Sequence, residues 1–464
     1  MNSTIKKQNK KIDMCNGNLF LKIFQFCIPL ALMGMLSLLF NTADLIVVSN
    51  FSGDENALGA VGSTTSLINL TINLFMGLSV GTNVICAKYL GSKNYDGVSR
   101  VVHTSILISL IIGIIFGILG FLFAGELLIL MNNDLELSKI YLKIYFLGLP
   151  FNLMYNFAAA ILRAAGDTKK PLYFLFISGI INVILNLIFV IFLKMSVAGV
   201  ATATVISQFI SFVLIMVTLY KTKECYQFRI SKLTIHKREL KEILRIGLPA
   251  GIQSSLFSIS NVIIQASVNL FGPSVMSGNS AASNIENYVY IAMNSVYHAA
   301  LSFTGQNVGA RKIENIKKVT IYSLSIVTII AVIMGGSFFL MRYPLVKIYT
   351  RVPDEMDVAI IRLHYLCLPY FLCGIMDVMG GILRGMGFSL SPTIVTIGGV
   401  CGFRILWIFF VFYNLTDFIN ITDLNYLYVV YPISWIITFL ILLSIYLLFR
   451  KRKFNQIKFE HEMI

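Results

Sequence analysis

Three acidic side chains lie within long apolar stretches of the sequence: Asp44, Glu286 and Asp377. An ionised carboxylate at the centre of a bilayer costs about 2.5 to 3.5 kcal/mol or more unless it is paired, so each should face a bundle interior or a wet cavity. A carboxylate in that setting can bind Na⁺ or carry a proton. The alternative for each is a hydrogen-bonded polar contact between helices.

Amide and hydroxyl side chains accompany the first of these acids in the same kind of stretch. Asn182 and Asn186 share one helix face at i, i+4, Thr204 and Gln208 do the same further along, and Asn41 precedes Asp44 by about one turn. Their oxygens could complete an ion site with a carboxylate. Hydrogen bonding between helices is the alternative role.

A substrate cavity would need polar groups and adaptable apolar side chains. Arg404 lies deep in an apolar stretch, where it could pair with Asp377 or bind carbonyl groups. Arg163 and Arg384 fall at predicted helix ends, where capping or snorkelling is expected and contact with substrate is the alternative. Pro29 removes a backbone donor upstream of Asp44 and predicts a kink that could act as a hinge. The candidate cavity residues are Asn41, Met33, Gln253, Gln265, Met293, Met376 and Arg404.

No motif of enzymatic or metal chemistry appears. The sequence has no P-loop, no HExxH and no GxSxG, and its seven cysteines show no metal-ligand spacing. We therefore expect no enzyme activity, no structural metal and no cofactor beyond a coupling ion.

The composition is that of an integral membrane protein. Charged residues make up 13% of the 464 residues, hydrophobic residues 57%, and the mean hydropathy is +0.79, whereas about 25% of the residues in a soluble domain are charged. The net charge of +15 lies in short clusters between apolar stretches, where basic residues set membrane orientation. Nucleic acid is therefore not an expected partner.

Apolar stretches long enough to cross a bilayer predict an all-α protein with 12 transmembrane helices. The expected spans are residues 24–48, 57–87, 103–123, 141–162, 172–193, 199–220, 247–270, 281–304, 320–341, 358–383, 393–413 and 426–448.

The basic residues predict the orientation of these spans. Of the 37 Lys and Arg residues, 29 fall on the side of the two termini and seven on the opposite side, so both termini should be cytoplasmic. We expect a multi-pass protein of the cell (inner) membrane, surrounded by lipid, without a cleaved signal peptide and monomeric.

An internal repeat relates the two halves of the chain. The segments ILRAAGDTKKP and ILRGMGFSLSP recur at an offset of about 220 residues. Six helices per repeat predict two bundles related by a pseudo-two-fold axis along the membrane normal, with a central cavity and alternating access. The expected parts are a tail (1–22), an N-lobe (23–220), a basic linker (221–245), a C-lobe (246–448) and a second tail (449–464).

Together these segments resemble the multidrug and toxic compound extrusion (MATE) transporters of the multidrug, oligosaccharidyl-lipid and polysaccharide exporter superfamily, prokaryotic branch. The resemblance covers about residues 20 to 450 and rests on the order of PLALMGMLSLLFNTAD, GTNVICAKYLG, ATVISQ, GLPAGIQSSL and GQNVGARK together with the repeated pair.

The resemblance implies an antiporter that exports organic, often cationic, compounds in exchange for H⁺ or Na⁺. It places the coupling site of the N-lobe on Asp44, Asn182 and Thr204, and Asn186 stands where that branch often has an Asp. Another branch uses acids of the C-lobe, which makes Asp377 and Glu286 second-rank coupling or substrate residues here.

We expect a cavity lined by acids and nearly free of bases, with Arg404 as its available base, and hence a preference for small organic cations and drugs. A flippase for lipid-linked oligosaccharide or polysaccharide precursors is the alternative within transport, because an anionic pyrophosphate needs Arg or Lys in the cavity. A receptor or channel is the alternative from another class.

Overall fold

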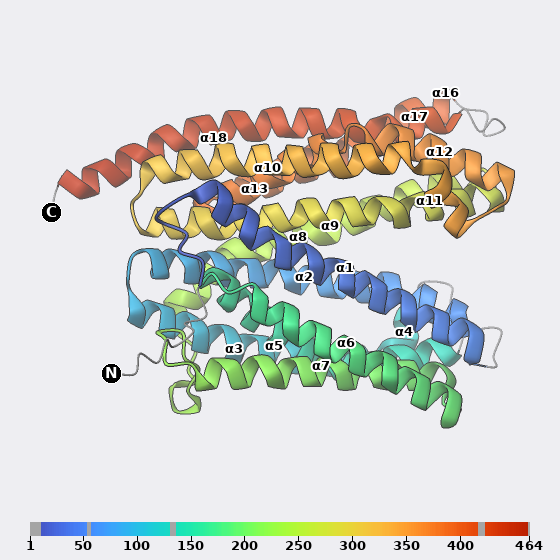
Figure 1. The fold of residues 1–464 in the computed structure, drawn as a ribbon, viewed down its shortest axis with the longest axis horizontal. Coiled ribbons are helices and arrows are strands. Elements are labelled where there is room, and N and C mark those ends of the chain that lie inside the picture. Colours follow the sequence, from blue (N-terminus) through green and yellow to red (C-terminus); the bar gives the residue numbers. More distant parts are fainter. Residues whose placement is uncertain (1–10, 53–56, 130–135, 416–422, 463–464) are drawn as a thin grey trace, which may run out of the picture.

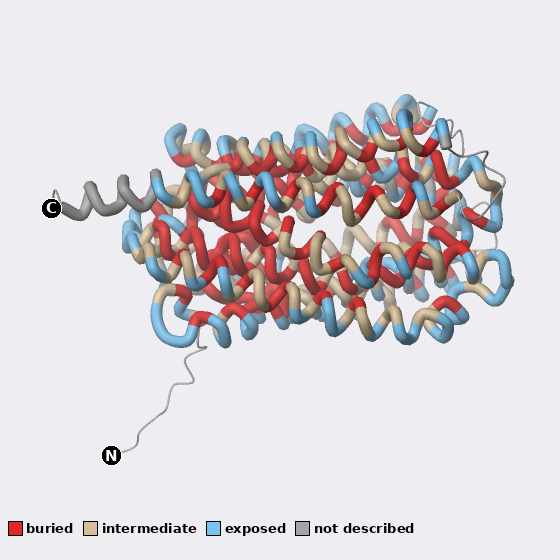
Figure 2. Tube along the Cα trace, turned by 90° about the horizontal axis from the view of Figure 1, so that it is seen from above, coloured by how far each residue is buried: buried red, intermediate tan, exposed pale blue. Residues whose placement is uncertain are grey.

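The computed structural model describes residues 11–52, 57–129, 136–415 and 423–462, and within these ranges every regular element is a helix. Figure 1 shows long helices running side by side in two groups, and the two ends of the chain lie at the same end of the molecule. In Figure 2 the buried residues lie between the helices and the exposed residues on their outer sides. The all-α membrane fold predicted from the sequence is confirmed.

The first half of the chain forms one group of helices, the lower group of Figure 1, with α1 at its boundary to the second. Its elements are α1 (Leu19–Phe51), α2 (Ala57–Gly91), α3 (Tyr95–Leu122), α4 (Ala124–Ile129), α5 (Glu136–Ala164), α6 (Lys169–Leu187), the π-helical η1 (Ile188–Phe192) and α7 (Ser196–Lys221).

The second half forms the other group. Its elements are η2 (Ile230–Lys232), α8 (Lys237–Asn269), α9 (Pro273–Gly309), α10 (Ile313–Leu340), α11 (Arg342–Tyr349), α12 (Pro353–Cys367), α13 (Tyr370–Gly385), α14 (Leu390–Thr396), η3 (Ile397–Gly402), α15 (Phe403–Trp407), η4 (Ile408–Phe412), α16 (Tyr413–Leu415), α17 (Leu424–Tyr428) and α18 (Val430–Glu462).

Ten helices of the described residues are long and apolar enough to cross a membrane, or 11 if the bent pair α12 and α13 counts as one span. The pair bends by 48° next to Pro369, because proline cannot donate the helical hydrogen bond. The predicted eighth span, α9, is not among them. It packs against α1, α2, α10, α12 and α13, so it can carry polar residues without exposing them to lipid.

The two halves meet where α2 packs on α8. Gly77 and Gly81 of α2 face Gly247 and Gly251 of α8 so closely that a Cβ on Gly77 would lie 2.0 Å from the backbone nitrogen of Gly251. Small residues four apart on both helices allow this backbone contact, which is a common device between membrane helices.

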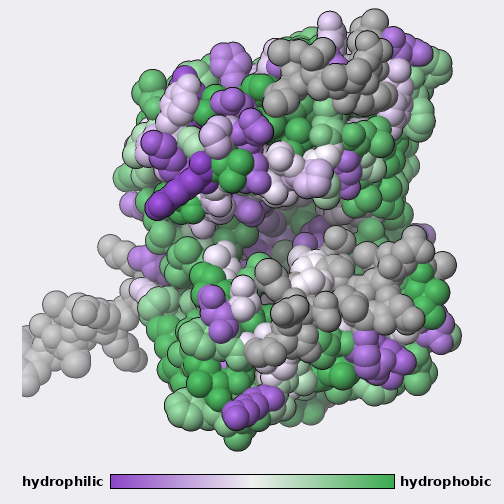
Figure 3. All heavy atoms as spheres, turned by 90° about the vertical axis from the view of Figure 1, so that its right-hand side faces the viewer, coloured by the Kyte–Doolittle hydropathy of each residue, from purple (hydrophilic) through white to green (hydrophobic). Residues whose placement is uncertain are grey.

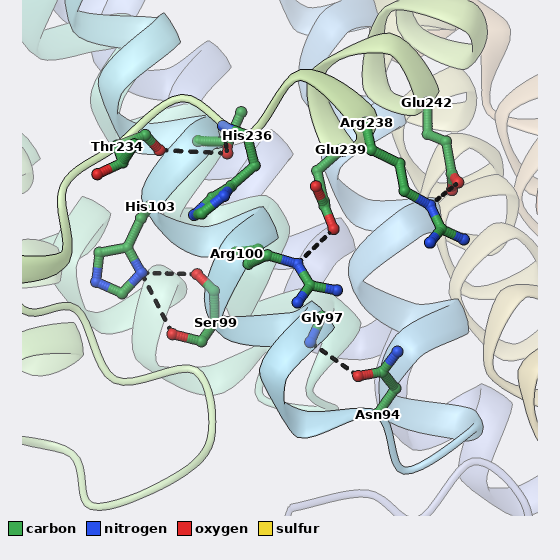
Figure 4. A network of polar contacts seen from close by, with 11 residues as sticks. Asn94, Gly97, Ser99, Arg100, His103, Thr234, His236, Arg238, Glu239 and Glu242 are labelled. Atoms are coloured by element: carbon green, nitrogen blue, oxygen red, sulfur yellow. Dashed lines mark hydrogen bonds and ion pairs between the residues drawn. The ribbon is translucent and has the colours of Figure 1, made fainter.

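The linker between α7 and α8 is bound to α3, as Figure 4 shows. The Nε2 atom of His103 accepts a hydrogen bond from the backbone N–H of Arg229 at 3.0 Å, and the backbone N–H of His236 donates to the hydroxyl of Thr104. Arg100 then pairs with Glu239, in the first turn of α8, at 2.6 Å. The start of the second half is thus fixed to the first half.

The N-terminal segment before α1 contacts both halves. The backbone N–H of Ile12 donates to the carbonyl of Gly166, beyond the end of α5, at 3.2 Å. Met14 is fully buried and its carbonyl accepts from Asn307 of α9, while Lys312 and Asn315 donate to the carbonyl of Cys15. We call residues 12–16 the strap.

Candidate functional site

A polar cluster lies inside the first half, where α1, α6 and α7 meet. The amide of Asn186 donates to the carboxylate of Asp44 at 2.5 Å and to the side-chain oxygen of Asn182 at 3.3 Å. Asn182 in turn donates to the hydroxyl of Thr204 at 3.5 Å. The structure therefore brings together the four residues that the sequence proposes for an ion site.

The oxygens of this cluster suit a small cation. The side-chain oxygen of Asn186 is buried without a hydrogen-bond partner, although buried polar atoms are normally paired. Carboxylate, amide and hydroxyl oxygens are the ligands of hard cations, and a lone carboxylate can equally take up a proton. The searched part of the chain has no group of three His, Cys, Asp or Glu that could hold a metal.

A second site is a cavity of about 770 Å³ between the two halves. Helices α1, α2, α5 and α6 contribute from one half, and α8, α9, α12, α13, α15 and α18 from the other. Figure 3 looks at the end of the molecule opposite the chain termini and shows a hollow with hydrophilic side chains between the two halves.

Four arginines and two carboxylates line this cavity, so its formal charge is +2 when both acids are ionised. The expectation of a nearly base-free cavity is therefore wrong. The lining residues that carry charge are Arg163, Arg362, Arg384, Arg404, Glu286 and Asp377.

Glu286 and Arg362 neutralise each other in the wall of the cavity. Arg362 of α12 donates through Nε and Nη2 to both carboxylate oxygens of Glu286, and through Nη1 to the side-chain oxygen of Asn279 at 2.6 Å. Tyr428 donates to the same Asn279 oxygen at 2.9 Å. Glu286 is thus held by contacts with residues distant in the sequence, which no local sequence pattern predicts.

Asp377 and Arg404 do not form the pair that the sequence suggests. Arg404 donates through Nε to Ser434 at 3.1 Å, and its guanidinium carbon lies 4.2 Å from the ring centroid of Tyr431. Among the described residues Asp377 has neither a hydrogen-bond nor an ion-pair partner. Its carboxylate remains available to the cavity.

The other predicted cavity residues divide into two groups. Met33, Gln253, Gln265 and Met376 line the cavity together with Arg404. Asn41 is exposed on the outside of α1, and Met293 is buried against Gly374 of α13, so neither faces the cavity.

Sequence reasoning favoured capping or snorkelling over substrate contact for Arg163 and Arg384 and did not place them among the cavity residues. Both stand in the last turn of a helix, which suggested capping, but both are 4% exposed and line the cavity. The Cα–Cβ bond of a helical residue is tilted toward the helix N-terminus, so a side chain near the C-terminus extends back along the helix. Their matched positions in ILRAAGDTKKP and ILRGMGFSLSP were the signal that could have identified them.

The comparison with protein families finds one match, to the family model described as MatE, at residues 29–188 and again at residues 249–410. The two matched segments correspond to the internal repeat of the sequence.

Two curated relatives match most of the chain. Probable multidrug resistance protein YoeA of Bacillus subtilis is 26% identical over 438 residues, which is 92% of this chain and 93% of the relative. Probable multidrug resistance protein NorM of Thermotoga maritima is 25% identical, over 81% of this chain and 82% of the relative.

A solved structure has the same fold. It is described as the outward-facing conformation of a multidrug resistance MATE family transporter of the MOP superfamily. It aligns with a TM-score of 0.86 at 22% identity, covering 98% of this chain and 100% of that one.

Proposed function

Because the chain belongs to the MatE family, we propose that it is a secondary active multidrug efflux antiporter. It exports drug-like organic compounds through the central cavity by alternating access, in exchange for H⁺ or Na⁺ bound at Asp44. The family match and the multidrug resistance names of the relatives support efflux transport. The observation that carries the exchange is the half-buried carboxylate of Asp44 beside the buried, unpaired oxygen of Asn186.

Helix α1 offers a physical connection between the ion site and the cavity. It carries Asp44 toward α6, and about two to three turns earlier it lines the cavity with Met33, Gly34 and Ser37. It also packs against α9 and α10 of the second half. Occupation of Asp44 by a cation neutralises a half-buried charge within the helix bundle, so it changes the preferred position of α1. Pro29, buried within α1, is the proposed hinge.

We further propose that the chain lies in the cell membrane as a monomer, with both termini in the cytoplasm. In that orientation the hollow of Figure 3 faces outward. The cytoplasmic side is then the one on which the α9 residue Gln306 donates to the carbonyl of Ala164 at 2.7 Å and Ser302 to Asn83 at 2.9 Å. These bonds between the halves would break when the transporter opens inward.

The test is dye efflux from proteoliposomes under a pH gradient and, separately, a Na⁺ gradient. Ethidium and carboxyfluorescein serve as a cationic and an anionic reporter, and wild type is compared with Asp44→Asn and with Asp377→Asn. We expect flux driven by one of the two gradients and lost in Asp44→Asn. If coupled flux persists in both variants, the assignment of the coupling site is wrong.

A flippase for lipid-linked sugar precursors is the second candidate function. The three cavity arginines that are not paired with Glu286, namely Arg163, Arg384 and Arg404, favour it, because such lipids carry a pyrophosphate that arginine binds well. Absence of dye flux under both gradients, from a stable monodisperse preparation, would favour this candidate over the antiporter.

A further inference from the structure

We propose that Arg163 and Arg384, which line the same cavity from the last turns of equivalent helices in the two repeats, are binding residues for the anionic group of the transported molecule. The ligand is an amphiphile with a carboxylate, sulfonate or phosphate on an apolar body. That the bound molecule is also transported rests on the proposed function, whereas its binding at these arginines does not.

Arg163 is a buried cation without a counterion. Its side chain lines the cavity and is 4% exposed, and none of its nitrogens has a hydrogen-bond or ion-pair partner among the described residues. An isolated buried charge is costly unless it is compensated. A bound oxyanion would supply that compensation.

Arg384 occupies the equivalent place in the second repeat. It is held by two neutral partners, since Nη1 donates to the hydroxyl of Tyr297 at 3.0 Å and Nη2 to the side-chain oxygen of Gln253 at 2.5 Å. Its Nε is buried and unpaired. These contacts hold the guanidinium in position without neutralising its charge. A positioned guanidinium that keeps its charge is suited to binding an oxyanion.

The nearest acid forms no ion pair with Arg384. Asp377 precedes Arg384 by seven residues on the same face of α13, and because the Arg384 side chain extends back to Gly380, the two charges interact electrostatically without direct contact. No ion pair joins them in the described part of the chain, and Glu286 is already occupied by Arg362. With the Glu286 pair set aside, three arginines face one carboxylate.

The rest of the lining suits an apolar or aromatic body. Aromatic residues of α8, α9, α13 and α18 line the cavity, and they can stack on a ring or cover a steroid-like surface. They are Phe257, Tyr290, Tyr297, Tyr370, Tyr431 and Trp435.

The experiment measures equilibrium binding to the purified full-length protein in phosphatidylcholine nanodiscs, with no ion gradient. The probes are three dansyl compounds on the same alkyl linker, ending in a carboxylate, a primary amide or a trimethylammonium group, followed by dansyl anisotropy. We expect the carboxylate to bind about tenfold or more tightly than either other probe, because charge-assisted hydrogen bonds to arginine are strong.

Arg163→Gln and Arg384→Gln should each weaken carboxylate binding about tenfold and leave the amide probe unchanged, which also shows that the variant is folded. Lys241→Gln, at an exposed position of α8 outside the cavity, is the control for loss of one positive charge. Asp377→Asn should tighten carboxylate binding, a gain that misfolding cannot produce.

Binding of the ammonium probe as tight as that of the carboxylate, or arginine variants that affect all three probes equally, would overturn the proposal.

A second experiment, with nanodiscs that contain phosphatidylglycerol, distinguishes a lipid headgroup from a free amphiphile as the bound anion. Displacement of the carboxylate probe by this lipid, relieved in Arg163→Gln, would assign the site to a lipid headgroup, and unchanged binding would assign it to a free amphiphile. Failure of dye flux with intact carboxylate binding would reject the antiporter but not this site.

Discussion

Glu286 and Arg362 form an ion pair inside the wall of the cavity, and both side chains are at most 9% exposed. Arg362 is further held by Asn279, which also accepts a hydrogen bond from Tyr428. A buried pair adds little net stability compared with apolar residues, but loss of one member leaves a buried charge without a partner. These two residues are therefore expected to matter for folding more than for transport.

We expect Glu286→Gln and Arg362→Gln each to lower the free energy of unfolding, with Glu286→Gln the more severe because it leaves a buried guanidinium uncompensated. The loss should be about 3 to 5 kcal/mol. Thermal unfolding of the purified protein in detergent measures it.

The double variant Glu286→Gln and Arg362→Gln is the control, and it should recover part of the lost stability, since neither charge is left unpaired. Losses that simply add in the double variant would show that the two residues do not interact in solution. Asp377→Asn, which breaks no pair among the described residues, should leave the unfolding temperature nearly unchanged.

Among the elements, α2 and α8 make the closest contact between the two halves. Gly77 and Gly81 face Gly247 and Gly251, and a Cβ added at Gly251 would lie 2.2 Å from the carbonyl oxygen of Leu74. No side chain can be accommodated at that distance without moving the helices apart. The glycines thus determine how tightly the halves close.

We expect Gly251→Ala to force α8 away from α2 and to weaken the closed side of the molecule. Overpacking of this kind costs about 1 to 3 kcal/mol. The expected result is a lower unfolding temperature together with reduced dye flux in proteoliposomes.

Gly336→Ala in α10 is the matched control, because nothing lies within 4 Å of the Cβ position there. An alanine within a helix is about 0.5 to 1 kcal/mol more favourable than glycine, so this variant should be neutral or slightly stabilised. Equal destabilisation by both substitutions would contradict the close-contact explanation.

At the scale of the whole molecule, the strap connects the two halves at the end where the chain termini lie. It binds the first half through Ile12 and Gly166 and the second through Asn307 and Asn315. Burial raises the pKa of the Cys15 thiol to about 11, the negative charge of Asp13 acts in the same direction, and Lys312 and Lys22 oppose them. The reactivity of Cys15 therefore reports whether the strap is bound.

We expect Cys15 in a Cys225→Ser background to react slowly with N-ethylmaleimide at pH 8 and faster as the pH rises through 11. The thiolate is the reactive form, and raising the thiol pKa from 9.0 to about 11 makes it about 100-fold rarer at that pH. The other cysteines, Cys27, Cys86, Cys367, Cys373 and Cys401, are buried.

The double variant Asn307→Ala and Asn315→Ala should release the strap and speed this reaction about tenfold or more, as the thiol pKa falls toward its usual value. Asn414→Ala, an exposed amide in α16 that donates to the carbonyls of Phe409 and Phe410 in the preceding η4, is the control. Rapid alkylation of Cys15 already at pH 8 without these substitutions would show that the strap is not bound in solution.

The sequence by itself determined the membrane class, nearly all of the long helices and the repeat, because each depends on local hydropathy or on spacing along the chain. It also singled out Asp44, Asn182, Asn186 and Thr204, since a carboxylate and amides in apolar stretches must find polar partners, and the structure brings these four side chains together, while their role as an ion site stays a prediction. The sequence also predicts a span within α9, but the full helix is not among those long and apolar enough to count as a membrane span.

Only the tertiary structure decided the charge of the cavity. Whether an arginine at a helix end faces solvent or the interior depends on the direction of its side chain and on the helices around it, neither of which is encoded by local spacing. Arg163 and Arg384 turn inward, Arg362 binds Glu286, and Arg404 stacks on Tyr431 instead of pairing with Asp377. The net charge of a cavity is the sum of the charges on side chains from helices that are distant in sequence, so it is determined only when these helices pack together.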